Sequence, residues 1–534
     1  MPVNESSATT RASLGMALGT LASRLSGFAK LAVLAYALGY GPLSDSYNLA
    51  NNTPNIIYDL ILGGILAATL IPVFVDRLAT RDPVQAGEDI SAVIGVAGAV
   101  LIVATVVFAL AAGPIVGLYT LGNHSAAAPA ERHAATTLLR LFAPQLAFYG
   151  FISLITAVLN AHRRFVVPMF APVINNLVVI GVLVEFIHLT HHRPGLTSLN
   201  TSTHLSLLLG LGTTAGVVLQ GLILVPSLIR AGAGISWRWD PSNEAVRTIV
   251  RLSGWTLGFV VTNQVALFIV LALADRHAGG VTAYNYAYTF FQLPFGIIAV
   301  SIMSAIQPGL ARAWALGDRP GFRIELARGL RRTNALIIPA ATGYLVLAGS
   351  IVTLILHFGT NRSSGVHTTA VTLAFFALGL PGFCAYLLFV RAYQAMQNTR
   401  AAFWLYLLEN GLNVVLAFVL FGVMGTPGLA LALSLSYTAG ALVAGASLSW
   451  RRVGIAGTGT MTVLGRVLFA SACMGGAVAA VAAVGGALGM NHGAALVAKL
   501  AISAFVGVSV LVVVAGYAAD RRSQAGVTSA WSRY

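Results

Sequence analysis

The sequence predicts an all-α polytopic membrane protein with about fourteen transmembrane helices. We expect two six-helix lobes in a pseudo-two-fold repeat, followed by two extra C-terminal helices. Three observations predict this fold: long apolar runs recur along the chain, charged residues are scarce, and several positions repeat between the halves. Hydrophobic residues make up 57% of the 534 residues and charged residues 9%, whereas a soluble domain carries about a quarter charged residues.

The apolar runs are each long enough to cross a bilayer, which takes about 20 residues in a helix. We expect spans near residues 12–40, 46–75, 91–119, 134–161, 166–189, 204–229, 246–274, 281–311, 333–358, 368–396, 401–423, 427–449, 465–489 and 493–518. The first run is too long for a cleavable signal peptide and lacks a small-residue cleavage pattern, so we interpret it as a helix.

The basic residues are distributed unevenly between the two sides of these spans. Most of the 31 Lys and Arg fall in loops on the side of the two termini. This is the positive-inside pattern, which places both termini in the cytoplasm. The net charge of +15 therefore reflects topology, and no nucleic-acid partner is expected.

The two halves of the chain resemble each other weakly. Residues of the first half recur about 236 to 240 positions later, as Pro54 and Pro294, Pro144 and Pro381, Arg164 and Arg400, and Asn176 and Asn413. Six helices per half would insert both halves the same way up, and transporters built from such repeats bind substrate between them. We therefore expect an N-lobe at 1–235, a C-lobe at 236–452, and two further helices with a short cytoplasmic tail at 453–534.

The first span carries two cations, Arg24 and Lys30, although a cation in hydrocarbon costs about 2.5–3.5 kcal/mol on insertion scales. The two positions diverge around a straight helix, but both side chains are long enough to converge on one wide cavity. Arg24 then binds an anionic lipid headgroup, because guanidinium matches phosphate oxygens in pairs. Alternatively, Lys30 snorkels to an interface while Arg24 pairs with Asp59 or Asp45.

Other polar residues inside spans give weaker signals. Arg140 lies one turn before a proline and either lines the cavity or pairs locally. Glu409 and Asn413 are four residues apart on one helix face and, with Asn263 or Gln264, could coordinate a cation. A structural hydrogen-bond cluster between helices is the alternative interpretation.

No signature of catalysis is found. The chain lacks a phosphate-binding loop with a following Lys-Ser/Thr and a His-Glu-x-x-His zinc motif, and neither cysteine suggests a metal site. We expect a transporter and not an enzyme, with no metal or organic cofactor.

The opening of the chain resembles the MurJ (MviN) family of lipid II flippases, in the multidrug/oligosaccharidyl-lipid/polysaccharide exporter superfamily. The resemblance rests on SRLSGFAKLAVLAYALGYGPLSDSYNLANNTPNIIYD, on TAVLNAHRRFVVPMFAPVINN, on QLPFGIIAVSI and on LGLPGFCAYLLFVRAYQAMQNTRAAF. It implies a flippase that moves undecaprenyl-diphosphate-linked peptidoglycan precursor from the inner to the outer leaflet by alternating access. It also implies a place in the bacterial cytoplasmic membrane, and Na⁺ or the membrane potential as the driving force.

The resemblance also assigns substrate-binding positions. Arg24 and Lys30 fall on the first and second basic residues of the opening motif, and Asp45 falls on the aspartate of the following turn. Where the family has an arginine pair in the second helix, this chain has Tyr58 and Asp59.

The eighth helix departs from the family pattern in the same way. Thr289 and Gln292 stand where the family has an arginine and an acidic residue. Either Arg24, Lys30 and Arg140 hold the diphosphate without those arginines, or the substrate differs.

Two alternatives to lipid II flipping stay open at this point. One is export of another polyprenyl-linked saccharide or an amphipathic small molecule. The other is a non-transporting membrane scaffold within the cell-wall synthesis machinery. The expected partners are lipid II or a related undecaprenyl-diphosphate lipid, membrane lipids, and cell-wall synthesis proteins.

Overall fold

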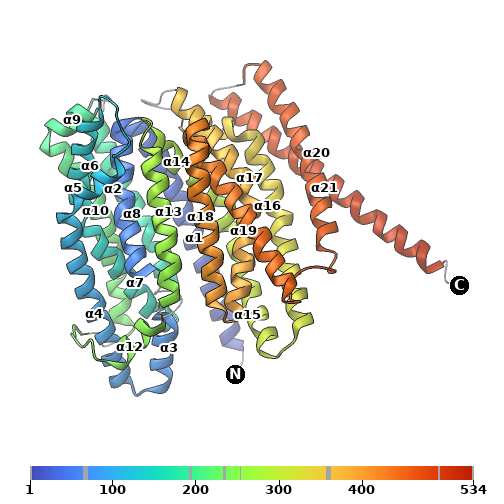
Figure 1. Cartoon of the computed structure of the whole chain (residues 1–534), viewed down its shortest axis with the longest axis horizontal. Coiled ribbons are helices and arrows are strands. Elements are labelled where there is room, and N and C mark those ends of the chain that lie inside the picture. The colour runs from blue at the N-terminus through green and yellow to red at the C-terminus, as the bar shows by residue number, and fades with distance from the viewer. Residues whose placement is uncertain are drawn as a thin grey trace. The chain divides into compact units, whose positions relative to one another are not determined.

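The computed structural model describes residues 3–63, 70–191, 195–232, 236–252, 254–356, 363–490 and 493–531, and the regular structure in them is helical (Figure 1). Thirteen helices in these ranges are long and apolar enough to cross a membrane. They coincide with thirteen of the fourteen predicted spans. The remaining one, at 46–75, includes residues 64–69, which lie outside the described ranges.

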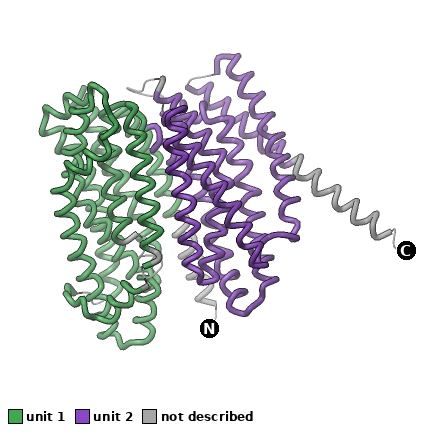
Figure 2. Tube along the Cα trace, viewed as in Figure 1, with its two compact units in different colours: residues 1–282, 358–361 green, residues 283–357, 362–534 purple. Residues whose placement is uncertain are grey.

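Contacts between residues divide the chain into two compact units (Figure 2). The first covers residues 1–282, and the second covers the described residues from 283 onward. The expected lobe boundary at residue 235 falls inside the first unit, because the helix at 254–274 packs within it. The arrangement as six plus six helices concerns the sequence repeat and stays a prediction.

The first unit is a bundle of long helices joined by short ones. Its helices are α1 (Val3–Leu38), α2 (Pro42–Tyr58), α3 (Ile71–Thr80), α4 (Pro83–Leu110), α5 (Ala112–Tyr119), α6 (Ala128–Phe142), α7 (Pro144–Ala161), α8 (Val166–Leu189), α9 (Leu196–Thr201), α10 (Thr203–Leu222), α11 (Val225–Arg230), α12 (Glu244–Leu252) and α13 (Gly254–Ala274). α1 packs along α8, α10 packs against α8 and α6, and α2 packs against α6. These contacts surround the polar cavity described below.

The second unit is built from longer helices. The chain enters it within α14 (Gly280–Pro294) and continues through α15 (Val300–Ala315), α16 (Arg319–Leu356), α17 (Ser363–Ala395), α18 (Thr399–Met424), α19 (Thr426–Trp450), α20 (Thr460–Ala487) and α21 (Gly493–Trp531). α17 packs against α19 and α16, α18 packs against α19, and α20 packs against α16 and α21.

One predicted span is interrupted at an identifiable residue. The span at 134–161 is two helices, because Pro144 has no N–H to donate and begins α7. The span at 246–274 contains α12 and α13, and residue 253 between them lies outside the described ranges.

A π-helical turn follows each proline of the repeated pair Pro54 and Pro294. Helix α2 contains Pro54 and continues into a π-helical turn, η1 (Asp59–Gly63), while α14 ends at Pro294 and continues into a second one, η3 (Phe295–Ala299). The two turns begin 236 residues apart, within the range of offsets of the sequence repeat. π-helical turns are rare and often lie at functional positions.

Candidate functional site: a polar cavity in the first unit

The first unit contains a partly open cavity of about 370 Å³. Its lining comes from α1, α2, α7, α8 and α10, and consists of Ser23, Lys30, Leu34, Tyr47, Asn51, Asn55, Tyr149, Pro172, Asn175, Asn176, Val179, Thr213 and Val217. Most of these residues carry amide or hydroxyl groups, and Asp and Glu are absent from the set. A volume of this size lies at the lower end of small-molecule pockets.

Lys30 is the cation in this lining. Ser23, Lys30 and Leu34 are separated by seven and four residues, so they share one face of α1. Lys30 is half-buried, and among the described residues its ammonium has no hydrogen-bond or ion-pair partner. A positive charge removed from water without a counter-ion is costly, so the cavity is suited to an anionic guest.

The asparagines provide the wall of the cavity. Asn51 and Asn55 are four residues apart on one face of α2. The side-chain amide of Asn176 donates to the Ser26 hydroxyl at 3.0 Å and so joins α8 to α1. The side-chain oxygen of Asn175 is buried and has no hydrogen-bond partner. These groups can donate to and accept from a polar ligand.

The other two predicted cations lie elsewhere. Arg24 and Arg140 are exposed and are not among the lining residues. Neither forms an ion pair among the described residues. The lining of this cavity contains Lys30 and neither Arg24 nor Arg140. The expected convergence of Arg24 and Lys30 is therefore not seen in this lining, because their positions diverge around α1.

The two predicted partners of Arg24 bind other groups. Asp45 is buried and accepts hydrogen bonds from the backbone N–H groups of Gly279 and Thr282 and from the Thr282 hydroxyl, at the beginning of α14. Asp59 accepts a hydrogen bond of 2.7 Å from the side-chain amide of Gln264 on α13. An ion pair of Arg24 with either carboxylate is therefore not formed, because both carboxylates are satisfied by uncharged donors.

Three other residues differ from the family pattern, and all three are partly buried: Tyr58, Thr289 and Gln292. The Tyr58 hydroxyl lies 2.5 Å from the Ser153 hydroxyl on α7. In the second unit, Thr289 donates to the Asn285 carbonyl at 2.9 Å. Gln292 is half-buried and forms a side-chain hydrogen bond with Tyr288.

A separate buried carboxylate occupies the second unit. Glu409 on α18 is 1% exposed and accepts hydrogen bonds from Asn410 at 2.8 Å and from Ser436 at 3.3 Å. Asn413, one turn later, has a buried side-chain oxygen without a partner. Asn263, the third residue of the predicted cation site, belongs to the first unit.

The first unit also contains a carboxyl cluster that the sequence analysis did not predict. The side-chain amide of Asn123 donates to Glu131 at 3.1 Å and to Asp275 at 3.4 Å, and all three residues are buried. Burial raises the pKa of Asp275 to about 6, against the opposing effect of the Asn123 hydrogen bond. The three residues come from separate loops and helix ends, so neither spacing nor composition indicated that they meet.

Comparison with known proteins identifies the family. The sequence profile of the family described as Lipid II flippase MurJ matches residues 34–493. The chain belongs to the lipid II flippase MurJ family. This is a family of transporters, not of enzymes.

Individual MurJ relatives agree with the family match. A probable lipid II flippase MurJ of Rhizobium meliloti is 28% identical over 461 residues, which cover 86% of this chain and 84% of the relative. A probable lipid II flippase MurJ of Haemophilus influenzae is 25% identical, with 86% and 90% covered.

Solved structures share the fold. A lipid II flippase MurJ in an inward closed conformation superposes with a TM-score of 0.74 at 19% identity, covering 94% of this chain and 98% of that chain. An inward-facing MATE multidrug transporter of the MOP superfamily gives 0.65 at 14% identity, covering 80% and 94%. At these identities the comparison establishes the fold alone.

The MurJ match does not by itself identify the site. The matched residues begin after Arg24 and Lys30. The asparagines of the cavity were not predicted as site residues from the sequence. A pair of asparagines at i and i+4 on a membrane-spanning helix, such as Asn51 and Asn55, was the available signal.

Proposed function

We propose that this chain moves lipid II, the undecaprenyl-diphosphate-linked peptidoglycan precursor, from the inner to the outer leaflet of the bacterial cytoplasmic membrane by alternating access. Membership of the MurJ family supports this proposal. The structural observation that carries it is Lys30, an unpaired cation in a membrane-embedded polar cavity whose lining contains no acidic residue.

The chemistry of the cavity suits the region where diphosphate joins sugar. The Lys30 ammonium supplies a positive charge and up to three donors to a phosphate oxygen. Asn51, Asn55 and Asn175 supply amide donors and acceptors to neighbouring hydroxyl groups. A cavity of about 370 Å³ holds only part of such a headgroup.

The other predicted substrate-binding residues are part of this proposal with less direct support. They are Arg24, Asp45, Tyr58, Asp59, Arg140, Thr289 and Gln292. Arg24 and Arg140 are exposed, without an ion-pair partner among the described residues, and so are free to bind phosphate. We further propose that both termini face the cytoplasm and that cell-wall synthesis proteins are partners.

Complementation of a strain depleted of its own lipid II flippase tests the function. The wild-type chain should restore growth and prevent lipid II from accumulating in the inner leaflet, whereas Arg24→Ala and Lys30→Gln should not. A chain with arginine introduced by Tyr58→Arg and Thr289→Arg provides the comparison. Rescue by this version alone would mean that the natural substrate is another polyprenyl-linked saccharide.

We also propose that Glu409 and Asn413 take part in coupling transport to a monovalent cation such as Na⁺. Hard oxygen ligands suit such an ion, and the unpartnered oxygen of Asn413 close to a buried carboxylate fits this donor set. Lipid II transport that is the same in Na⁺ and in choline buffers would exclude Na⁺ coupling.

A further inference from the structure

Residues 236–252 connect α11 to α13 and are fixed tightly on the outside of α4. The backbone N–H of Ser236 donates to the Ser91 hydroxyl at 3.1 Å. A Cβ atom added at Gly95 would lie 2.0 Å from the carbonyl oxygen of Arg238, and one added at Gly98 would lie 2.9 Å from the Trp237 ring. Only glycine permits an approach this close, so the segment rests directly on the backbone of α4.

Ionic contacts hold the rest of the segment in place. Arg238 pairs with Glu88 at 3.1 Å, and the side-chain amide of Asn243 donates to Asp89 at 2.9 Å. Glu244 accepts from Arg81 at 2.8 Å and from Arg77 at 3.2 Å. The hydrogen bond from Arg77 lowers the pKa of Glu244, so this contact persists at neutral pH.

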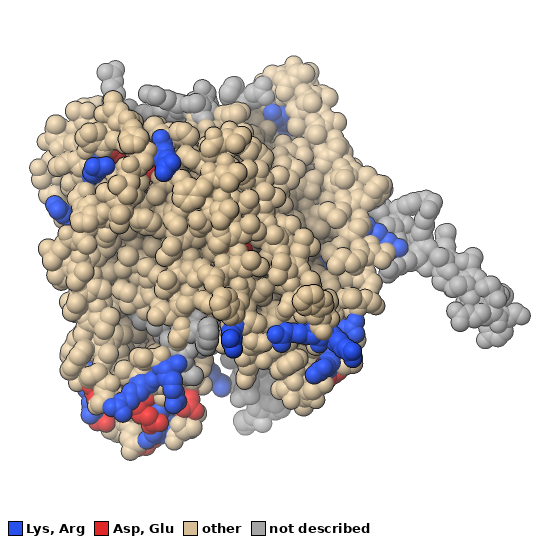
Figure 3. Space-filling view, in the orientation of Figure 1, with Lys and Arg blue, Asp and Glu red and all other residues tan. Residues whose placement is uncertain are grey.

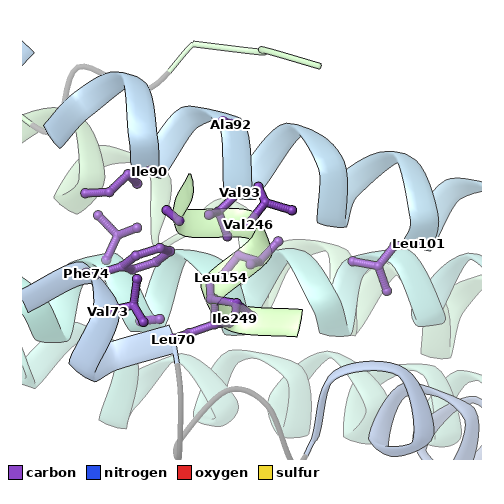
Figure 4. Close-up of a cluster of buried hydrophobic side chains, with 13 residues drawn as sticks. Leu70, Val73, Phe74, Ile90, Ala92, Val93, Leu101, Leu154, Val246 and Ile249 are labelled. Atoms are coloured by element: carbon purple, nitrogen blue, oxygen red, sulfur yellow. The ribbon is translucent and has the colours of Figure 1, made fainter. Parts of the chain in front are cut away.

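The inner face of α12 is buried in the core of the unit. Ala245, Val246 and Ile249 pack in one cluster with Phe74 of α3 and Ile90 of α4 (Figure 4). The buried positions follow the i, i+1, i+4 spacing of one helix face. The opposite face of α12 therefore points away from this buried cluster.

The exposed side chains of residues 236–252 include aromatic, apolar and basic ones. Trp237 is 63% exposed, Trp239 60% and Val250 69%. Arg247 and Arg251 are exposed and one helical turn apart, and neither has a side-chain partner among the described residues. Figure 3 shows charged side chains gathered at the end of the unit where Figure 1 labels α3 and α12.

The position of Trp237 along α4 suits a residue at the membrane boundary. Nine residues separate Asp89 from Gly98, which is about 14 Å along a helix at 1.5 Å per residue. The Trp237 ring lies against Gly98, and so about that far along α4 from Asp89, which binds Asn243. Indole rings concentrate where headgroups meet acyl chains, a region between the charged loops and the apolar part of a helix long enough to span the membrane, such as α4.

We propose that residues 236–252 form a binding surface for anionic phospholipids of the leaflet that faces the basic loops. Trp237 and Trp239 enter the boundary between headgroups and acyl chains, while Arg247 and Arg251 bind lipid phosphates. Glu88, Asp89 and Glu244 form ion pairs with other arginines, and Asp240 within the segment accepts hydrogen bonds from Ser242. Among the described residues none of these acids pairs with Arg247 or Arg251, so the positive charge of both is left for a ligand, and the exposed indoles of the same segment favour a lipid surface.

Native mass spectrometry of the purified full-length protein tests this surface, with phosphatidylglycerol and phosphatidylcholine added in separate titrations. Arg247→Gln combined with Arg251→Gln should weaken phosphatidylglycerol binding roughly tenfold or more, since each basic residue near an anionic surface contributes about 1 kcal/mol. Phosphatidylcholine binding should stay unchanged, which also verifies that the variant is folded. Trp237→Ala combined with Trp239→Ala should weaken the binding of both lipids.

A matched pair in the second unit provides the control. Arg312 and Arg319 are also exposed without a side-chain partner among the described residues, and their change to Gln removes the same charge. This pair should leave phosphatidylglycerol binding within about twofold of wild type. An equal loss for both pairs, or none at Arg247 and Arg251, would overturn the proposal. If the Arg247→Gln and Arg251→Gln variant bound phosphatidylglycerol normally and lost only the binding of a polyprenyl phosphate titrated in the same way, the proposal would be overturned as well.

Discussion

Replacing Lys30 should change ligand binding and stability in opposite directions. The ammonium lies in a polar cavity without an acidic neighbour in the lining, so Lys30→Gln removes one charge-assisted contact with a bound diphosphate. Such a contact contributes about 1.5–3 kcal/mol, which corresponds to a loss of about 10- to 150-fold in affinity. The same change removes a half-buried unpaired cation, so the free energy of unfolding should rise by about 1–2 kcal/mol.

Both quantities can be measured on one preparation in detergent. Undecaprenyl diphosphate binding gives the affinity, and thermal unfolding followed by tryptophan fluorescence gives Tm, which should rise by a few degrees. Lys30→Arg keeps the charge and should retain most of the affinity. If Lys30→Gln lowers Tm and affinity together, Lys30 is structural and the reasoning is refuted; unchanged affinity would refute it too.

Three further perturbations have definite expected outcomes. Burial raises the pKa of Asp275 to about 6, so ionisation of this carboxyl opposes folding and Tm should fall as pH rises from about 4 to 6. Asp275→Asn should flatten this dependence of Tm on pH. An unchanged dependence would contradict the raised pKa of Asp275. Glu409→Gln should abolish any increase in Tm on replacing choline with Na⁺, and a retained increase would place the ion elsewhere. Phe74→Ala, at a fully buried core position, should cost about 3–5 kcal/mol, whereas Leu110→Ala, at a 77% exposed position, should leave Tm within about a degree if burial is the cause.

The helices were largely predictable from the sequence, whereas their interruptions were not. Apolar runs of about 20 residues carry a strong signal, and thirteen of the predicted spans correspond to described helices. The short helix α11 went unrecognised, because its six residues continue the apolar run of α10.

The site was predictable only in part. We expected Arg24 and Lys30 to converge on one cavity, whereas the lining contains Lys30 and not Arg24. The lining depends on five helices meeting, and that information lies in tertiary packing. Asn123, Glu131 and Asp275 were missed for the same reason, since a hydrogen bond across 152 residues leaves no local pattern.

The π-helical turn at Asp59–Gly63 begins at the residue that ties α2 to another part of the first unit. Asp59 accepts a hydrogen bond of 2.7 Å from Gln264 of α13. Any change in the winding of this turn would move the Asp59 carboxylate relative to Gln264, so the geometry of the turn and the position of α13 depend on one another.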